Sequence, residues 1–223
     1  MKTILSFLSI FLLIGGCKID NYDPPQITLS GRIIDSQTNK LVESGGSNAG
    51  SVVKLYQDSS NQSLIFRTFP DGTFMNSTVF PGNYMYKAEG PFQMAANELQ
   101  NIQITKNLEI DIKVIPNVRL IGSLVSKSGP TAIIKVTYEK VPPDQQLVQL
   151  GVVWSTVNNP NLFTFIGGNV ITKDVQSLNL MTGEEQFTIS GLKTNTLYYI
   201  RAAARTNAAG NYYNYSTQIE LQE

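Results

Sequence analysis

The feature that most limits the fold of this chain is its hydrophobic pattern, which from residue 27 onward has period two or forms apolar runs of strand length. The clearest example is residues 108–114, where apolar side chains occupy the even positions and charged ones the odd positions. Successive side chains of a strand point to opposite faces, so such a segment buries one face and wets the other. No segment after the N-terminal apolar run keeps a helical period over several turns. The sequence therefore predicts an all-β fold.

Two groups of predicted strands are separated at Ile115-Pro116-Asn117, where a proline ends the alternation and cannot continue a ladder inside a sheet. We expect two tandem β-sandwich domains, at residues 26–115 and 116–223. The first group of predicted strands covers residues 27–34, 51–56, 64–68, 73–79, 83–88 and 108–114. The second group covers residues 118–126, 133–139, 148–155, 162–166, 185–189, 197–206 and 214–221.

Tight turns mark the first predicted domain. Asp71-Gly72 between two strand-like runs is a hairpin signal, because both residue types tolerate positive φ, and Pro81-Gly82 predicts a second turn. The motifs are, in order, GRIID (31–35), SVVKL (51–55), DGTF (71–74) and PGNY (81–84). In this order they resemble the carboxypeptidase-regulatory or transthyretin-like β-sandwich. The polar insert at residues 43–50 departs from that pattern.

The second predicted domain has about seven short strands, the number typical of an immunoglobulin-like sandwich. Its segment GLKTNTLY (191–198) resembles the fibronectin type III signature, in which a tyrosine hydroxyl ties a corner to upstream backbone. Alternation places Tyr198 and the next even positions in the core, with Arg201 and Arg205 on the other side. We expect Trp154 to be a packing residue of this core.

The N-terminus reads as an export signal. Lys2, the apolar run at residues 4–14 and the small glycines before Cys17 form a secretory signal, residues 1–16. The stretch Leu13-Ile14-Gly15-Gly16-Cys17 resembles the bacterial lipobox, which implies that Cys17 is diacylated and begins the mature chain. The alternatives are a transmembrane helix, which needs about 20 residues, and an ordinary buried cysteine.

Residues 17–25 are polar, acidic and end in two prolines, so we expect the lipidated cysteine to be followed by an extended tether. By resemblance to known lipoprotein sorting, the lack of aspartate directly after Cys17 implies export to the outer membrane. The nearby Asp20 and Asp23 favour display on the cell exterior. The expected location is thus the outer membrane, through a lipid anchor and facing outward.

Composition excludes several classes of function. The chain has 17 Lys and Arg against 17 Asp and Glu, so no basic surface for nucleic acid is expected. It has no histidine and one cysteine, which excludes Cys/His zinc sites, His-dependent nucleophiles and disulfides. We expect no metal and no cofactor. Carboxylates could in principle hydrolyse glycosides, but nothing in the sequence places two of them together, so we expect no enzyme.

The candidate binding site is the loop at residues 207–215, and its candidate residues are Asn211, Tyr212, Tyr213 and Tyr215. Loops at the end of such sandwiches present binding residues, and aromatic rings beside amides suit the faces and hydroxyls of sugars. The alternative is that Tyr213 and Tyr215 pack inward while Tyr212 covers an edge. Phe163 and Phe165 alternate in a predicted strand and fit either exposure or cross-strand packing.

The order of signal, tether, transthyretin-like domain and fibronectin-like domain resembles a family of uncharacterised two-domain lipoproteins from Bacteroidales. Members often lie beside glycan-uptake systems, so the resemblance implies a surface lipoprotein that binds polysaccharide or assists a glycan transporter. The alternative is a structural or adhesive lipoprotein that contacts other proteins through its sandwiches. Sugar binding predicts exposed, roughly coplanar tyrosines, whereas protein contact predicts an apolar patch or an open edge strand.

Overall fold

The structure, a computed structural model, describes residues 24–46, 50–57, 60–96, 98–162, 169–176 and 180–222. The predicted signal at residues 1–16, Cys17, most of the tether, and Phe163 and Phe165 lie outside the described residues. Within the described ranges the elements are strands, and none of these residues forms a helix long and apolar enough to cross a membrane. The prediction of an all-β, sandwich-like protein is confirmed.

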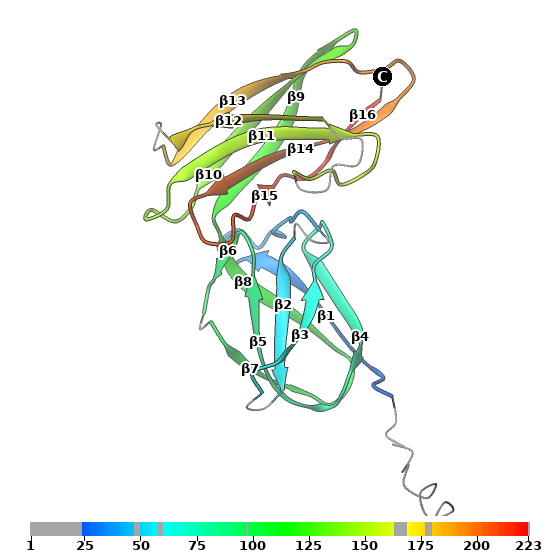
Figure 1. Ribbon diagram of the computed structural model, residues 1–223, viewed down its shortest axis with the longest axis vertical. Coiled ribbons are helices and arrows are strands. Elements are labelled where there is room, and N and C mark those ends of the chain that lie inside the picture. Colours follow the sequence, from blue (N-terminus) through cyan, green and yellow to red (C-terminus); the bar gives the residue numbers. More distant parts are fainter. Residues whose placement is uncertain are drawn as a thin grey trace, which may run out of the picture.

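The N-terminal sandwich is built from two antiparallel-rich sheets (Figure 1). One has the strand order β4-β1-β8-β6 and the other β3-β2-β5-β7. Their strands are β1 (Ile27–Asp35), β2 (Val52–Gln57), β3 (Ser63–Arg67), β4 (Thr73–Val79), β5 (Gly82–Glu89), β6 (Phe92–Met94), β7 (Gln100–Ile104) and β8 (Leu108–Pro116). The short strands β6 and β7 had no clear alternation and were not predicted.

Strand β8 contains the alternating segment 108–114, and its burial follows the alternation. It pairs in parallel with β1, with Ile33 opposite Ile112, and these two side chains are fully buried between the sheets. The charged residue Asp111 lies on the opposite face, where it pairs with Arg32 at 2.8 Å. The period of two thus places one face of β8 in the core and the other in solvent.

The Asp71-Gly72 turn forms, but the predicted hairpin is wrong. Gly72 has φ +83°, and the backbone nitrogen of Phe69 donates to the carbonyl of Thr73 at 2.7 Å. The flanking strands β3 and β4 nevertheless belong to different sheets. Local turn chemistry specifies a reversal of the chain, whereas burial of the strand faces decides which neighbour each strand takes.

The C-terminal sandwich continues after a join of one residue, Asn117. One sheet has the order β13-β10-β9 and the other β12-β11-β14-β15, with β16 also paired to β14. The strands are β9 (Val118–Ser128), β10 (Thr131–Lys140), β11 (Leu147–Ser155), β12 (Asn169–Asp174), β13 (Thr182–Ile189), β14 (Leu197–Thr206), β15 (Asn214–Tyr215) and β16 (Ile219–Gln222). The predicted strand at 162–166 lies almost wholly outside the described residues.

Two sequence predictions for this core hold. Trp154 is 5% exposed and packs among the buried residues of both sheets. The hydroxyl of Tyr198 accepts a hydrogen bond from the backbone nitrogen of Lys193 at 3.0 Å, five residues upstream. This bond anchors the turn that leads into β14, as the tyrosine position in the sequence predicted.

Candidate functional site

The two sandwiches lie end to end (Figure 1). Residues of both line an open cleft of about 810 Å3. Its N-terminal side is the connection after β1, and its C-terminal side is formed by β9, β10, β13 and the segment around β15. The N-terminal lining residues are Asp35, Thr38, Lys40, Leu41, Val42 and Glu43. The remaining lining residues are Pro116, Val118, Arg119, Leu120, Ile121, Gly122, Thr137, Tyr138, Glu139, Thr182, Gly183, Glu184, Asn214, Tyr215, Ser216 and Thr217.

A buried ion pair joins the two sides of the cleft. Asp35 ends β1 and is 3% exposed, and its two carboxylate oxygens accept from Arg119 at 2.7 and 3.2 Å. Burial by itself would raise the pKa of Asp35, but hydrogen bonds from Arg119, the Gln37 backbone and the Thr38 hydroxyl outweigh it and lower that pKa. The carboxylate therefore stays ionised and holds β9 against the end of β1.

Arg119 also organises the polar wall beside it. Its guanidinium donates to Glu139 at 2.9 Å and to the side-chain carbonyl of Gln37 at 2.7 Å. Glu139 lies opposite Arg119 in the β9–β10 register, so the pair follows directly from strand pairing. A planar guanidinium with several donors suits such a junction of acceptors.

The rest of this wall is the outer face of the β13-β10-β9 sheet. In register, Thr137 lies between Ile121 and Glu184, and its hydroxyl donates to Glu184 at 3.1 Å. Ile121 is 63% exposed and gives the wall an apolar patch among hydroxyls and carboxylates. A hydrogen bond from Lys135 lowers the pKa of Glu184.

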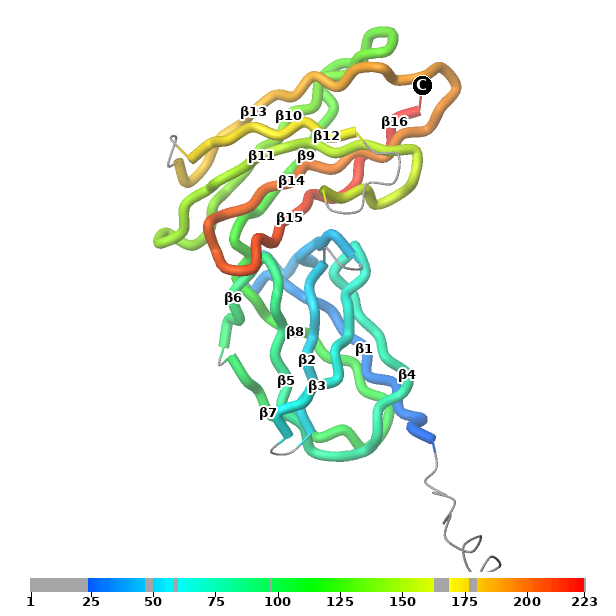
Figure 2. Tube along the Cα trace, in the orientation of Figure 1, coloured from blue at the N-terminus to red at the C-terminus, as the bar shows by residue number. Residues whose placement is uncertain are grey.

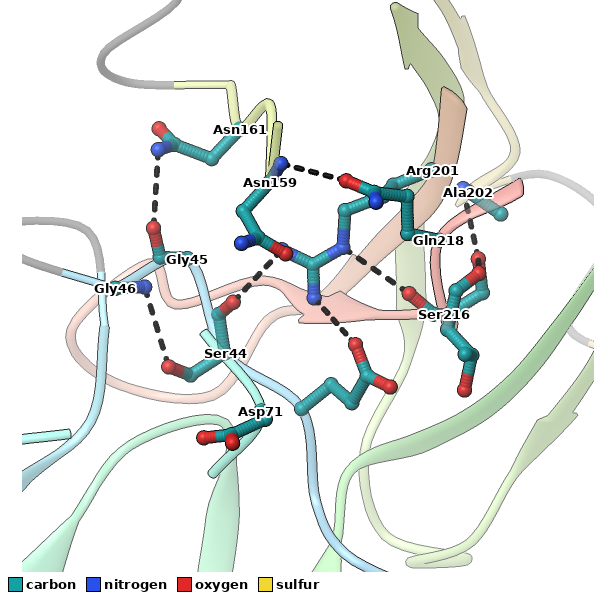
Figure 3. Close-up of polar contacts among 12 residues, drawn as sticks. Ser44, Gly45, Gly46, Asp71, Asn159, Asn161, Arg201, Ala202, Ser216 and Gln218 are labelled. Carbon is teal, nitrogen blue, oxygen red and sulfur yellow. Dashed lines mark hydrogen bonds and ion pairs between the residues drawn. The ribbon is translucent and has the colours of Figure 1, made fainter. Parts of the chain in front are cut away.

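Behind the cleft, Arg201 of β14 binds the N-terminal sandwich (Figure 3). Its side chain is 0% exposed and donates to the Ser44 carbonyl at 3.0 Å and to Glu43 at 2.9 Å. It also donates to the Ser216 carbonyl at 3.1 Å within its own sandwich. Burial lowers the pKa of Arg201, and the Glu43 carboxylate partly opposes that effect. The contact fixes Glu43 in the cleft wall.

A second contact across the junction lies next to Arg201. The side-chain amide of Asn161, itself 5% exposed, donates to the Gly45 carbonyl at 3.0 Å. Beside it, the backbone nitrogen of Asn159 donates to Gln218 at 2.6 Å. The connection after β11 is therefore held both to the N-terminal sandwich and to the segment before β16.

Tyr215, a candidate binding residue, is buried and unavailable as a sugar platform. It is 5% exposed, packs with Val153 and Ala203, and lies with its ring 4.6 Å from the guanidinium carbon of Arg201. Its hydroxyl accepts from the Leu162 backbone at 3.1 Å, and burial raises its pKa to about 12. The inward packing considered for the loop is the arrangement found for this ring.

Two of the other three candidates, Tyr213 and Asn211, bind Arg205. Tyr213 is partly buried, and its hydroxyl donates to Gln149 and accepts from Arg205 at 3.1 Å. Asn211, with φ +53°, accepts from Arg205 at 3.2 Å. The rings of Tyr213 and Tyr215 lie at 44° to each other, so they are not coplanar. Tyr212 is half-exposed beside Gly210.

The loop nevertheless lies close to the cleft. Figure 2 shows the chain turning after β14 and returning as β15 on the side that faces the N-terminal sandwich. Asn214 of β15 accepts from the Val118 backbone at 2.9 Å, and Ser216 and Thr217 line the cleft. The structure therefore brings the end of the predicted loop, with Asn214 and the buried Tyr215, to the cleft, whereas the Tyr213 hydroxyl is bound to Gln149 and Arg205.

The residues that build the cleft were mostly missed by sequence reasoning. Asp35 stands out in the sequence only as part of a strand motif and, like Glu184, as one of several carboxylates that no pattern pairs, and nothing in the sequence singles out Arg119. Arg201 was assigned to the outer face of its strand, and the signal that marks it is an arginine amid the small apolar residues of β14. Its partners Glu43 and Ser44 lie more than 150 residues away in the sequence, so no local pattern joins them.

The arrangement suits binding more than acid–base chemistry. Two of the cleft carboxylates, Asp35 and Glu184, have lowered pKa values, whereas a general acid at neutral pH needs a raised one. Within the described ranges, no group of three acidic or thiol side chains could hold a metal ion. Hydroxyls, an amide and paired charges line the cleft together with apolar side chains, among them the exposed Leu41 and Ile121, so the cleft offers a ligand both polar and apolar surface.

Residues 27–115 match the family model described as the N-terminal domain of DUF3823, a protein of unknown function. A DUF3823 family protein from Bacteroides uniformis ATCC 8492 has a TM-score of 0.75 at 21% identity, over 89% of this chain and 99% of that one. One from Parabacteroides merdae ATCC 43184 has a TM-score of 0.72 at 18% identity, over 90% and 100%.

A further structure from B. uniformis ATCC 8492, described as a candidate carbohydrate-binding protein, has a TM-score of 0.69 at 18% identity, over 89% of this chain and 100% of its own. At these identities the solved structures show the shared fold. No curated protein matches this sequence. The resemblance to an uncharacterised Bacteroidales family is confirmed.

Proposed function

We propose that this protein, whose residues 27–115 match the N-terminal domain of the DUF3823 family, is a non-catalytic outer-membrane surface lipoprotein that binds polysaccharide or assists a glycan-uptake complex. The observation that carries the proposal is the cleft between the sandwiches. Its walls combine hydroxyls, amides and carboxylates with the exposed side chain of Ile121. Such a mixture suits sugar hydroxyls and the apolar faces of sugar rings.

The fold supports a binding role because it holds the cleft open in one geometry. Arg119 and Arg201 each link the two sandwiches through buried or half-buried charges. A preformed site loses less conformational entropy on binding than a flexible one. The structural relative described as a candidate carbohydrate-binding protein shares this fold.

The start of β1, which follows the proposed anchor in the sequence, and the cleft lie at opposite ends of the N-terminal sandwich. Strand β1 begins at Ile27, at the end remote from the C-terminal sandwich, and ends at Asp35 in the cleft (Figure 1). A nine-residue strand spans about 30 Å. A lipid on Cys17 would therefore hold the cleft away from the membrane surface, where a polymer can enter it.

The cleft is tested by affinity electrophoresis of the mature protein in gels containing soluble starch, xylan, galactomannan or pectin. Ile121→Arg places a long charged side chain in the cleft and should abolish retardation. The matched control is Val125→Arg on the same strand, which is 50% exposed and outside the cleft lining. Loss of binding in both variants, or in neither, would refute the cleft as the site. A separate variant, Tyr212→Ala, tests whether the half-exposed ring of the loop takes part in binding.

The anchor is tested separately in cells. Cys17→Ser should move the protein from the membrane fraction to the soluble fraction of a bacterium that processes lipoproteins. Protease added to intact cells should degrade the wild-type protein if it faces outward. Survival of the protein in intact cells, with digestion after lysis, would contradict display on the exterior.

A role in protein contacts is the second candidate, and exposed apolar side chains on edge strands favour it. Leu64 and Ile65 on β3, and Leu124 and Val125 on β9, are 41–55% exposed, and β3 and β9 are edge strands. Edge strands with exposed apolar residues can pair with another chain. Crosslinking on intact cells with Leu64→Lys and Leu124→Lys distinguishes this role, since each change should remove a specific crosslinked product.

A further inference from the structure

The outer face of the β3-β2-β5-β7 sheet carries a second hollow, separate from the cleft. It has a volume of about 260 Å3 and is lined by Tyr56, Ser60, Asn61, Met85, Lys87 and Leu99. The register explains the set, because Tyr56 on β2 lies opposite Met85 on β5 and the neighbouring pair is Lys54 with Lys87. Apolar and polar groups that are distant in sequence thus meet on one sheet face.

The hollow has an apolar floor that the fold leaves open. Leu99 is 46% exposed, and Tyr56 and Met85 are half-buried on the solvent side of the sheet. Neighbouring tyrosines on β5 are arranged differently, since the hydroxyls of Tyr84 and Tyr86 donate to protein acceptors at 2.9 Å. Within the described part of the chain, the Tyr56 hydroxyl makes no hydrogen bond, so it is available to a ligand.

Polar groups border this floor. Asn61 is exposed in the connection between β2 and β3, next to Ser60. Lys87 is held over the hollow by Glu89 at 2.9 Å and Glu98 at 3.3 Å, so its charge is balanced while its ammonium stays at the rim. Balanced charge beside amide and hydroxyl groups favours a neutral ligand with many hydroxyls over an anion.

We propose that this hollow is a second sugar-binding site, in which one neutral pyranose ring of a polysaccharide lies on Tyr56, Met85 and Leu99. An aromatic ring beside aliphatic side chains matches the apolar C–H face of a sugar, and the rim groups match its hydroxyls. The volume is below the range of about 300–1,000 Å3 that drug-sized ligands need, which fits a single ring of a longer chain.

The position of the hollow makes the protein bivalent for a long polymer. Tyr56 is near the end of β2 that points away from the C-terminal sandwich in Figure 1. The cleft is lined by residues where the two sandwiches meet, and so lies at the other end of the N-terminal sandwich. Two sites on one polymer bind with a high effective concentration, so the apparent affinity exceeds that of either site. This inference rests on the proposed function, because it assigns a second site for the same class of ligand.

The test is affinity electrophoresis of the mature protein in the same four polysaccharides. Tyr56→Ala should weaken apparent affinity for the retarding polymer at least tenfold, whereas Tyr56→Phe, which keeps the ring, should lose less. Met85→Ala should weaken binding, and its matched control Met75→Ala, a 59% exposed methionine on the other sheet, should bind as wild type. Near-UV circular dichroism of each variant checks that the fold is intact.

Each outcome separates the two sites. If Ile121→Arg abolishes retardation and Tyr56→Ala binds as wild type, the second site is refuted and the cleft stands. If Tyr56→Ala abolishes retardation and Ile121→Arg does not, the second site stands and the cleft proposal fails. If no polymer retards the wild-type protein, both are refuted, and a Tyr56-dependent crosslink on cells would then assign the hollow to a protein partner.

Discussion

Arg201 is the buried charge from which we expect a strong contribution to the stability of this protein. Its guanidinium is fully buried and has three acceptors, from Glu43, Ser44 and Ser216. Removing the cation leaves the Glu43 carboxylate, 19% exposed, without its partner. A buried charge without a partner is far costlier than the pair itself.

We therefore expect Arg201→Met to lower the free energy of unfolding by about 3 kcal/mol, measured by urea denaturation. Arg32→Met is the matched control, because Arg32 also pairs with a carboxylate at 2.8 Å but its side chain is 47% exposed. The free energy of unfolding should fall much less in Arg32→Met, because solvent and salt screen exposed ion pairs. Equal losses in the two variants would contradict the assigned importance of burial.

Asp35 makes stability depend on pH in a defined direction. Its pKa is lower in the folded protein than in the unfolded chain, where it is about 3.9. The folded state therefore binds this proton less readily than the unfolded chain does. The contribution of ionised Asp35 to the free energy of unfolding is complete at pH values above the unfolded pKa, and it is lost as the pH falls through the lowered pKa of the folded state. The relevant window is acid, below about pH 5.

Asp35→Asn should cost about 1 to 3 kcal/mol at pH 7, because it removes charge-assisted hydrogen bonds with Arg119. As the pH is lowered below about 5, the free energy of unfolding should fall less in the variant than in the wild type. Urea denaturation at several pH values measures this difference. Asp144→Asn, in an exposed turn, is the control for the substitution itself and should keep the wild-type stability at pH 7. An unchanged pH dependence in Asp35→Asn would refute this role for Asp35.

Among the elements, the turn before β4 is constrained by both conformation and space. Gly72 has φ +83°, and an added Cβ would lie 2.4 Å from the Val42 carbonyl oxygen. Gly191 has a similar φ of +77°, but a Cβ there has nothing within 4 Å. A substitution at Gly191 therefore tests the cost of the left-handed backbone alone, whereas one at Gly72 adds the cost of steric overlap.

Gly191→Ala should cost about 1 kcal/mol for the left-handed conformation alone, and Gly72→Ala clearly more. Both are measured by thermal and urea denaturation. If the two variants lose the same free energy of unfolding, the close approach of Gly72 to the Val42 carbonyl does not constrain the turn. Val42 belongs to the connection after β1, which lines the cleft.

The corner before β14 gives a second prediction for an element. Tyr198→Phe removes only the hydroxyl that accepts from the Lys193 backbone, so we expect a loss of about 1 kcal/mol. The control is Tyr199→Phe, the adjacent residue on the opposite face of the strand. Hydrogen exchange of the Lys193 amide should accelerate in Tyr198→Phe, and protection as in the wild type would contradict the bond.

At the scale of the whole molecule, the contacts across the junction should fix the angle between the sandwiches. The join itself is short, since β8 ends at Pro116 and β9 begins at Val118, but one residue can still act as a hinge. Two arginines reach across it, Arg119 to Asp35 and Arg201 to Glu43. Both belong to the C-terminal sandwich, and they bind the end of β1 and the connection that follows it.

The double variant Arg119→Met/Arg201→Met should therefore widen the distribution of interdomain angles and raise the radius of gyration in X-ray scattering. Arg32→Met/Lys135→Met, which removes two exposed pairs that do not cross the junction, is the control and should scatter as the wild type. A double variant whose scattering superimposes on the wild type would show that the one-residue join sets the angle by itself.

Much of the fold follows from short-range patterns. The alternation in residues 108–114 became β8, the proline at 116 marks its end, and the tyrosine at 198 forms its predicted corner bond. These features are local, because strand period, proline geometry and turn chemistry act over a few residues. The strands β6, β7 and β12 escaped prediction because their pairing partners, and not their own pattern, place them in sheets.

The sequence by itself determined the all-β class and the packing roles of Trp154 and Tyr198. Only the tertiary structure decided that β3 and β4 separate into different sheets, that Tyr215 lies under Arg201, and that Asp35 meets Arg119. The reason is the range of the interactions. Strand period and turns depend on neighbouring residues. The ion pairs of the cleft join residues 84 to 158 positions apart, which come together only when the apolar faces of the sheets are buried.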